Sequence, residues 1–171
     1  DCLLSRGLGD VYKRQALQYI KNDWVVISNN DVGYETNWFT GIMKIYNERD
    51  DIESFSPKDP LYYMKYYEWH FMDGDAKYFE SYEVSEAIMG WSLVIKKTSL
   101  DKIIPFDENF DMYYQDNDYS MMLQKNGIKH ALVRDSIASH LSTLYLSQPL
   151  DDKKKHKMTE GYIKYAKKWE K

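Results

Sequence analysis

Five carboxylates crowd into the stretch Phe106–Leu123, and no Lys or Arg lies between Lys102 and Lys125. Carboxylates this close repel one another, which raises their pKa values unless a cation or a basic reactant sits among them. Such clusters serve as metal sites or general bases, but they also occur as solvated acidic loops. The cluster alone leaves these interpretations open. Its members are Asp107, Glu108, Asp111, Asp116 and Asp118.

Two other segments precede this stretch, and the order of the three is informative. Trp24–Val32 is a β-rich run that passes into an Asn-Asn-Asp turn, and Ala87–Lys97 carries a Gly-Trp pair before a strand-like run that ends in lysines. Phe106–Tyr119 follows, with Gly127 and then His140 further on. In this order the segments resemble a family-2 glycosyltransferase with the GT-A fold.

The resemblance covers about residues 16–145 and implies an α/β fold with a mixed sheet flanked by helices. Residues 1–15 share no pattern with the rest and resemble translated adapter sequence, so we expect them to be foreign to the fold. Residues 16–171 would then be the C-terminal two-thirds of a single, incomplete GT-A domain. In that family the missing part holds the first strands, which bind the nucleotide.

A metal and donor site is implied at the end of the first strand. Asp31 follows the predicted strand Trp24–Ser28, and ligands of open α/β sheets bind beyond the carboxyl ends of strands. The family motif makes Asp31 a ligand of Mg²⁺ or Mn²⁺, with His140 as a second ligand. It also makes Asn29, Asn30 and Asp31 donor-binding residues. A plain turn and a structural histidine are the alternatives.

The same resemblance assigns the acceptor side. Asp116 would be the general base that takes the proton from an acceptor hydroxyl, and one in-line displacement with one base would invert the anomeric carbon. Gly90, Trp91 and Asp118 would bind the acceptor or support the site, with Trp91 exposed. Helix-start carboxylates and core packing are the structural alternatives.

Two positions depart from the family pattern. Gln115 stands where the family usually has Glu, which removes one charge beside Asp116. Met122 stands where Arg is common, which leaves donor and acceptor details open.

The composition narrows the class of partner. The net charge is −4 over 171 residues; residues 151–171 hold eight Lys against four acids, so they carry +4 and the first 150 residues carry −8. An acidic body argues against nucleic acid. The expected partners are a nucleotide-sugar donor and a glycan or lipid-linked acceptor, with peripheral membrane contact through the basic C-terminal helix as a further option. A single cysteine, Cys2, and the lack of a membrane-length apolar run fit a cytoplasmic protein, at the membrane surface if that contact forms.

Periodicity predicts the elements that position these residues. Aromatic residues from Tyr62 to Tyr82 could line an acceptor groove, although a helix packed on a sheet explains their spacing better. The expected elements are a strand over Trp24–Ser28, a helix over Asn37–Arg49 capped by Thr36 or Asn37, a strand over Ile52–Ser56 stopped by Pro57, a helix over Thr98–Ile103, a helix over Asn117–Asn126 closed by Gly127, a strand over Ile128–Arg134 and a helix over Met158–Trp169.

Two other classes of function remain open from the sequence. One is a metal-dependent hydrolase that uses the same acidic cluster. The other is a non-catalytic sugar-binding or structural fragment, in which the aromatic residues matter and Asp116 does not.

Overall fold

The computed structural model describes residues 19–60, 75–103, 107, 109–110, 113–141 and 151–170. Residues 1–15, most of the aromatic segment beginning at Tyr62, and the acids Glu108 and Asp111 lie outside these ranges.

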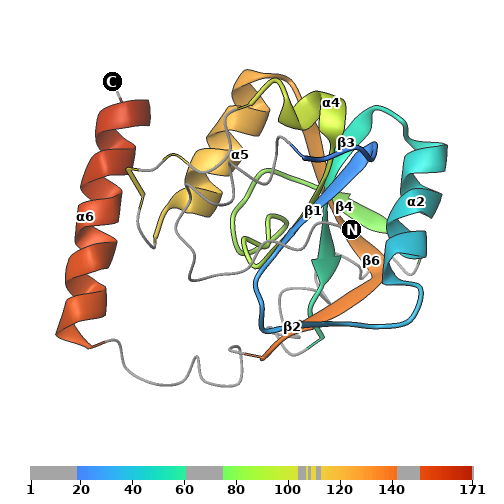
Figure 1. The fold of residues 1–171 in the computed structure, drawn as a ribbon, viewed down its shortest axis with the longest axis horizontal. Helices are drawn as coiled ribbons and strands as arrows, with labels where there is room; N and C mark the ends of the chain where they lie inside the picture. The colour runs from blue at the N-terminus through green and yellow to red at the C-terminus, as the bar shows by residue number, and fades with distance from the viewer. Residues whose placement is uncertain are drawn as a thin grey trace.

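The elements alternate irregularly between strands and helices along the chain (Figure 1). In order they are β1 (Trp24–Ser28), β2 (Val32–Tyr34), α2 (Trp38–Glu48), β3 (Ile52–Lys58), β4 (Tyr78–Glu80), β5 (Ser92–Lys96), α4 (Lys97–Leu100), α5 (Gln115–Lys125), β6 (Lys129–His140) and α6 (Asp152–Trp169).

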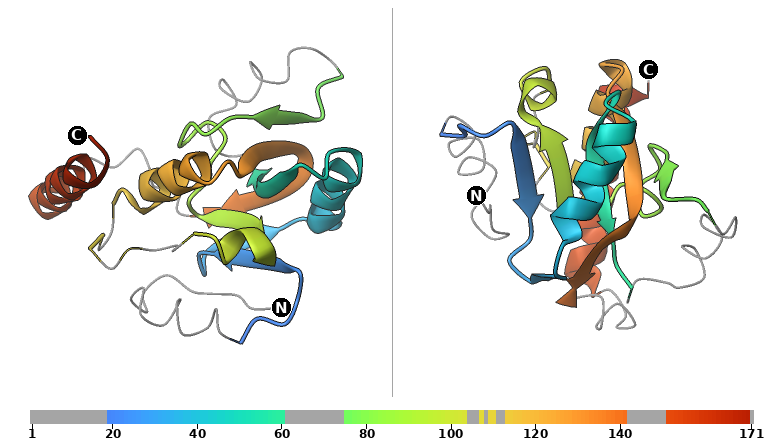
Figure 2. Two further views of the ribbon diagram at one scale, coloured as in Figure 1. Left: turned by 90° about the horizontal axis from the view of Figure 1, so that it is seen from above. Right: turned by 90° about the vertical axis from the view of Figure 1, so that its right-hand side faces the viewer.

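The strands form a mixed sheet in the order β1-β5-β3-β6-β2, with β4 also paired to β6. β3 and β6 are parallel, and the other pairs are antiparallel. Viewed from above, α2 covers one face of the sheet and α5 the other, with α6 outside α5 (Figure 2). The expected α/β class, a mixed sheet flanked by helices, is therefore confirmed.

The core divides between the two faces because side chains alternate along a strand. On β5, Leu93 and Ile95 pack in the cluster that contains Leu123 of α5, whereas Val94 packs in the cluster that contains Ile42 and Ile45 of α2. The sheet is thus buried on both sides. No helix in the described part of the chain is both long and apolar enough to cross a membrane.

β6 is longer than the sequence predicted, and it is irregular in the middle. A strand was expected to end at Arg134, but β6 continues to His140. Its register with β3 jumps from Pro57↔Val133 to Lys58↔Ile137, so the residues between Val133 and Ile137 have no partner in β3. Beyond this jump, Ala138–His140 pair with β2 instead.

Gly41 explains how α2 fits against this irregular part of β6. A Cβ at position 41 would lie 2.8 Å from the carbonyl oxygen of Asp135 and 3.0 Å from the amide nitrogen of Ser136. Glycine is a poor helix former, but only glycine allows the helix to approach the strand backbone this closely. The glycine in mid-helix is therefore a packing requirement.

Pro57 does not stop β3, contrary to the expectation. The strand runs on to Lys58, and at Pro57 it pairs only with β6, because its pairing with β5 involves Ser54 and Phe55. A proline has no amide hydrogen to donate, so it is tolerated where one side of the strand needs no partner.

Several helix boundaries also differ from the expected ones. Asn37 precedes α2 in a left-handed conformation (φ 64°) and its side chain makes no capping bond. α6 begins six residues earlier than expected, because Asp151 accepts a hydrogen bond from the amide of Lys154 and caps it. Tyr78–Glu80 form a strand rather than a helix. Gly127 follows α5 with φ 64°, as predicted.

A buried polar network crosses the core between β3, β6 and α5. His130 lies 2.7 Å through Nδ1 from Ser54 Oγ and 3.1 Å through Nε2 from the carbonyl oxygen of Ala87. The carbonyl can only accept, so Nε2 carries the proton and Nδ1 accepts from Ser54, which in turn accepts from Tyr119 Oη at 2.8 Å. Burial lowers the pKa of His130 to about 4, against the opposing effect of the hydrogen bond to Ala87.

This network predicts a pH-dependent stability. Because the pKa of His130 is about 4 in the fold and 6.5 as its ordinary value, protons bind the unfolded chain more tightly. The neutral His130 side chain therefore contributes fully to the free energy of unfolding above pH 6.5. This contribution is lost as the pH falls toward 4, by up to about 3 kcal/mol.

Urea unfolding at pH 7.5 and pH 5 measures this loss in the wild type and in His130→Asn, which cannot titrate. The variant should be less stable at pH 7.5 but should lose less on acidification. His156→Gln, at an exposed position on α6, is the matched control and should keep the wild-type slope. If His130→Asn lost as much unfolding free energy between pH 7.5 and pH 5 as the wild type, the network would not be the cause of the pH dependence.

Candidate functional site

Asp31 and His140 meet because the backbone pairing of β2 with β6 brings them together. Val32 is opposite His140 in the antiparallel register, and the amide of Leu141 donates to the carbonyl oxygen of Asp31 at 2.9 Å. The carboxylate Oδ1 of Asp31 then lies 3.2 Å from Nε2 of His140. Two residues that are 109 positions apart in the sequence are thus neighbours at one end of the sheet.

Asn29 is the third member of this group. Its side-chain nitrogen Nδ2 lies 3.2 Å from Nε2 of His140, and its backbone amide donates to the carbonyl oxygen of Trp91 at 2.8 Å. Asn30, also predicted to bind the donor, is exposed in the turn between Asn29 and Asp31.

Trp91 packs on the histidine instead of facing solvent. Its ring and the His140 ring are stacked, with centroids 5.5 Å apart and an interplanar angle of 14°. Trp91 is only 8% exposed, so the expectation of an exposed tryptophan was wrong. Its Nε1 is buried and has no hydrogen-bond partner among the described residues. A buried donor left unpaired costs about 1–3 kcal/mol, which a ligand oxygen would recover.

Gly90 brings Asp116 to the same end of the sheet. A Cβ at position 90 would lie 2.9 Å from Cβ of Asp116 and 3.0 Å from its Oδ2. The glycine was expected to allow close approach of a ligand; in the structure the group that approaches it is the side chain of Asp116. Gly90 is followed directly by Trp91, so the residue that contacts Asp116 is next in the chain to the tryptophan that stacks on His140.

Asp118 does not join this group. Residues two apart on a helix point roughly 200° apart, so Asp116 and Asp118 face opposite sides of α5. The Asp118 carboxylate is 1% exposed, and its Oδ1 accepts from Nε1 of Trp169 at 2.7 Å and lies 2.8 Å from Nζ of Lys168. In this structure Asp118 ties α5 to α6 and is closed off from an acceptor on the Asp116 side.

The donor set at Asp31 and His140 fits a divalent cation. Cis ligands of an octahedral Mg²⁺ lie about 3 Å apart, close to the 3.2 Å between Asp31 Oδ1 and His140 Nε2. Asp31 Oδ1 is buried and accepts no hydrogen bond from a described residue. If Asn29 donates to Nε2, that nitrogen has no proton, and it lies 3.2 Å from the carboxylate oxygen of Asp31 as a second electron-rich atom that repels it. A cation between them removes this repulsion.

Two protein ligands would leave most of the coordination shell to other groups. Within the described ranges, no cluster of three or more His, Cys, Asp or Glu side chains could hold a metal ion. Mg²⁺ commonly uses one or two carboxylates and takes its remaining ligands from water and substrate phosphates. The pair of side chains is therefore suited to a cation that arrives with a phosphate ligand.

One buried acid of this region was missed in the sequence. Asp59 is fully buried, and its Oδ2 accepts from the backbone amide of His140 at 3.2 Å. It comes directly after β3, just as Asp31 comes after β1, so the same signal would have found it had Pro57 not been taken as the end of the strand.

Three hydroxyl groups form hydrogen bonds next to the turn Asn29–Asp31. Tyr34 Oη donates to Ser28 Oγ at 2.8 Å and lies 2.9 Å from Ser92 Oγ, and Ser28 in turn donates to the carbonyl oxygen of Asn29. These bonds hold the backbone at the start of the turn that carries Asn29 and Asp31. The order of strands that creates them is not visible in the sequence.

No protein-family model and no curated protein matches this chain. Its function therefore has to be inferred from the chemistry of its own residues.

The pair Asp31–His140 predicts weak Mn²⁺ binding. Asp31→Asn and His140→Gln should each raise the dissociation constant by at least about tenfold, because each removes one of only two protein ligands. Isothermal titration with MnCl₂ at constant ionic strength measures this. Glu35→Gln is the control, an exposed acid four residues from Asp31 that should leave binding unchanged. Equal losses in Asp31→Asn and Glu35→Gln would mean that Mn²⁺ responds only to net charge.

The contact between Gly90 and Asp116 predicts a specific steric defect. Gly90→Ala places a methyl group where the Asp116 side chain lies, and overpacking of this kind costs about 1–3 kcal/mol. Gly33→Ala is the control, since a Cβ there meets nothing nearer than 4.0 Å. Denaturant unfolding compares the two. Removing the Asp116 side chain in Gly90→Ala/Asp116→Ala should restore much of the loss; a purely additive double variant would contradict the contact.

Proposed function

We propose that this protein is a metal-dependent glycosyltransferase of the GT-A type, which moves a sugar from a nucleotide-sugar donor to an acceptor hydroxyl and inverts the anomeric configuration. One observation carries the proposal. The residues that the family resemblance selects from separate segments, Asp31, Gly90–Trp91, Asp116 and His140, gather at one end of one sheet.

Transfer of a sugar poses two chemical problems, and this group of residues offers a separate answer to each. The departing diphosphate gathers negative charge, and the acceptor hydroxyl must lose its proton. A divalent cation, Mg²⁺ or Mn²⁺, supplies charge stabilisation to a diphosphate when bound. Asp31 and His140 would hold it, and the buried Oδ1 of Asp31, which accepts no hydrogen bond from a described residue, supports this role.

Asp116 is proposed as the general base. It stands in the first turn of α5, where the helix dipole favours the ionised carboxylate. Gly90 lies against Asp116, and because glycine has no side chain, position 90 places no side-chain atom between Asp116 and a ligand. An acceptor hydroxyl within hydrogen-bond distance of Asp116 would give up its proton there as the bond to the anomeric carbon forms.

His140, Trp91 and Asn29 are proposed to orient the donor. The stacked rings of Trp91 and His140 form one wall beside Asp31, and the buried Nε1 of Trp91, which has no hydrogen-bond partner in the described part of the chain, can donate to an oxygen of the ligand. Asn29 links this wall to the turn through the carbonyl of Trp91. Because these groups are held by backbone bonds, they need little reorganisation on binding.

The experiment uses the protein expressed from its complete gene. A panel of UDP-, GDP- and dTDP-sugars is incubated with MnCl₂, with and without hydroxyl acceptors, and release of nucleoside diphosphate is compared with formation of the glycosylated product. Product formation that depends on both Mn²⁺ and acceptor supports a transferase. Hydrolysis that an acceptor neither increases nor diverts would identify a hydrolase, and sugar binding without turnover would identify a binding protein.

The roles proposed for two acids on α5 predict opposite defects. Asp116→Asn should keep the donor affinity within a few-fold and lower the transfer rate by roughly 10²–10⁴, the contribution of a positioned base. Asp118→Asn should keep the transfer rate of the folded protein but reduce its stability by about 1–2 kcal/mol, because a charged partner of Lys168 is removed.

Turnover, donor affinity and unfolding free energy are measured for both variants. The two substitutions are chemically identical and two residues apart, so each serves as the control for the other. Normal turnover in Asp116→Asn, or a loss of donor binding that alone explains its defect, would remove Asp116 from the proposed role.

A further inference from the structure

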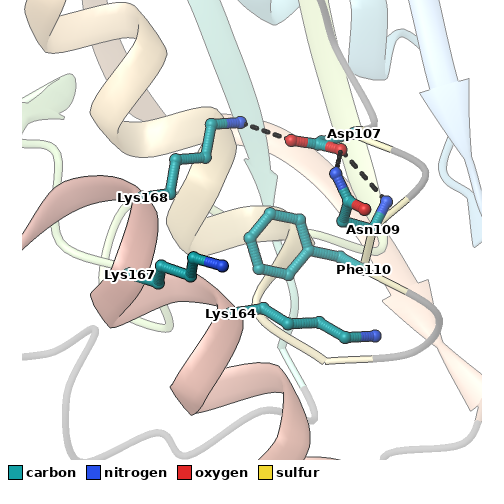
Figure 3. A pocket seen from close by; sticks show the side chains of 6 residues that line it. All are labelled: Asp107, Asn109, Phe110, Lys164, Lys167 and Lys168. Carbon is teal, nitrogen blue, oxygen red and sulfur yellow. Dashed lines mark hydrogen bonds and ion pairs between the residues drawn. The ribbon is translucent and has the colours of Figure 1, made fainter.

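A pocket lies on the far side of α5 from Asp116, between the loop that precedes α5 and the C-terminal half of α6 (Figure 3). Its volume is about 460 Å³, within the range of small-molecule sites. The loop contributes Asp107, Asn109 and Phe110, and α6 contributes Lys164, Lys167 and Lys168.

Lys168 is already occupied by structural contacts. Its Nζ lies 2.8 Å from Asp107 Oδ2 and 2.8 Å from Asp118 Oδ1. Burial opposes ionisation of Asp107, but the Lys168 ammonium and the bonds from Asn109 outweigh it, so the pKa of Asp107 is lowered and the group is ionised at neutral pH. This ion cluster forms a fixed wall of the pocket.

Lys164 and Lys167 differ from Lys168, because no ion pair joins either of them to a described residue. Positions 164, 167 and 168 are spaced by three and four residues, so their side chains leave the same side of α6. In Figure 3 the Lys167 and Lys164 side chains extend toward Phe110 of the loop, and only Lys168 reaches Asp107.

We propose that this pocket binds a phosphate group through Lys164 and Lys167. Among the described residues, the three lysines outnumber the carboxylates of Asp107 and Asp118 by one, and Lys168 neutralises part of the acidic charge, which leaves a local charge of +1 on the side of Lys164 and Lys167. A phosphate monoester carries −1.5 to −2 charges and three acceptor oxygens, and lysine binds it as a point charge. The pocket is larger than one phosphate group, so the part of the ligand that carries the phosphate also fits and can pack against the ring of Phe110.

The dipole of α6 explains only part of this arrangement. Cations in the last turn of a helix stabilise it, which accounts for Lys167 and Lys168. Lys164 lies before that turn, so its place in the pocket wall is not required by the dipole. The inference does not depend on glycosyl transfer, since it concerns binding at the opposite side of α5.

Phosphate groups of two origins would satisfy this chemistry: a soluble phosphorylated molecule and the headgroup of an anionic lipid. The probes are therefore sodium pyrophosphate and vesicles of phosphatidylcholine with or without phosphatidic acid. Pyrophosphate is titrated into the full chain at low ionic strength, with binding followed by calorimetry and by the amide shifts of Asn109 and Phe110. Vesicle binding is followed by co-sedimentation.

The test variant is Lys164→Gln/Lys167→Gln, and the matched control is Lys153→Gln/Lys154→Gln. Both remove two positive charges from exposed positions of α6, but the control pair lies about 15 Å or more along the helix from the pocket. Thermal unfolding should show both proteins folded, since Lys168 and its ion pairs are untouched.

The expected result is binding of at least one probe that weakens by about tenfold or more in the test variant and by less than about twofold in the control. Saturable pyrophosphate binding identifies a soluble ligand, and pocket-dependent binding to phosphatidic acid vesicles alone identifies a lipid headgroup. Equal losses in both variants would show attraction to the net charge of the helix, and no saturable binding of either probe would likewise overturn the proposal.

Discussion

The candidate site depends on the shortness of the link between β1 and β2. Only Asn29–Asp31 separate the two strands, so the chain from Ser28 to Val32 spans at most about 14 Å. β1 is at one end of the strand order and β2 at the other, four steps away, which in a flat sheet amounts to about 19 Å. The link can close only because the sheet is not flat there. The last residues of β6 must turn toward the end of β1, and this turn delivers His140 to Asp31.

The irregular register of β6 is where that turn is made. Between Val133 and Ile137 the strand loses its pairing with β3, and the glycine of α2 packs against this same stretch. Before it, β6 belongs to the main sheet; after it, Ile137 still pairs with Lys58 of β3, and Ala138–His140 pair with β2 and carry the site. Irregularities of this kind re-aim side chains near functional sites, and here one re-aims an entire strand end.

Local features of this fold were predictable, and the contacts between distant segments were only partly so. β1, α2 and the glycine after α5 follow from short-range rules, because propensity and turn chemistry act within a few residues. The length of β6, the passage of β3 through Pro57 and the burial of Trp91 depend on partners far away in the sequence. Asp118 was expected to support the same site as Asp116, and the structure places it elsewhere. Asp116 and Asp118 are on opposite faces of one helix, which two-residue spacing implies only once the helix start is known.

The described acids of the stretch Phe106–Leu123 therefore lie in two separate environments. Asp107 and Asp118 both form ion pairs with Lys168 of α6, a cation that comes about fifty residues after Asp118 in the sequence. Asp116 faces the other way, toward Gly90. The repulsion expected among crowded carboxylates is relieved by dividing them between two faces and by a lysine supplied from the C-terminal helix. The basic tail and the acidic body, which look like separate features of the composition, are parts of one charge balance.

That shared balance places a condition on how the protein can be shortened. α6 lies outside α5, at the edge of the molecule in Figure 1, so it looks like an element that could be removed. Its removal, however, would strip Asp118 of both Trp169 and Lys168 and uncover the core cluster around Leu123, against which Trp169 packs. A shortened chain would expose apolar side chains that α6 covers. The boundary of the folding unit therefore lies after Trp169, and α6 belongs to the domain that it borders.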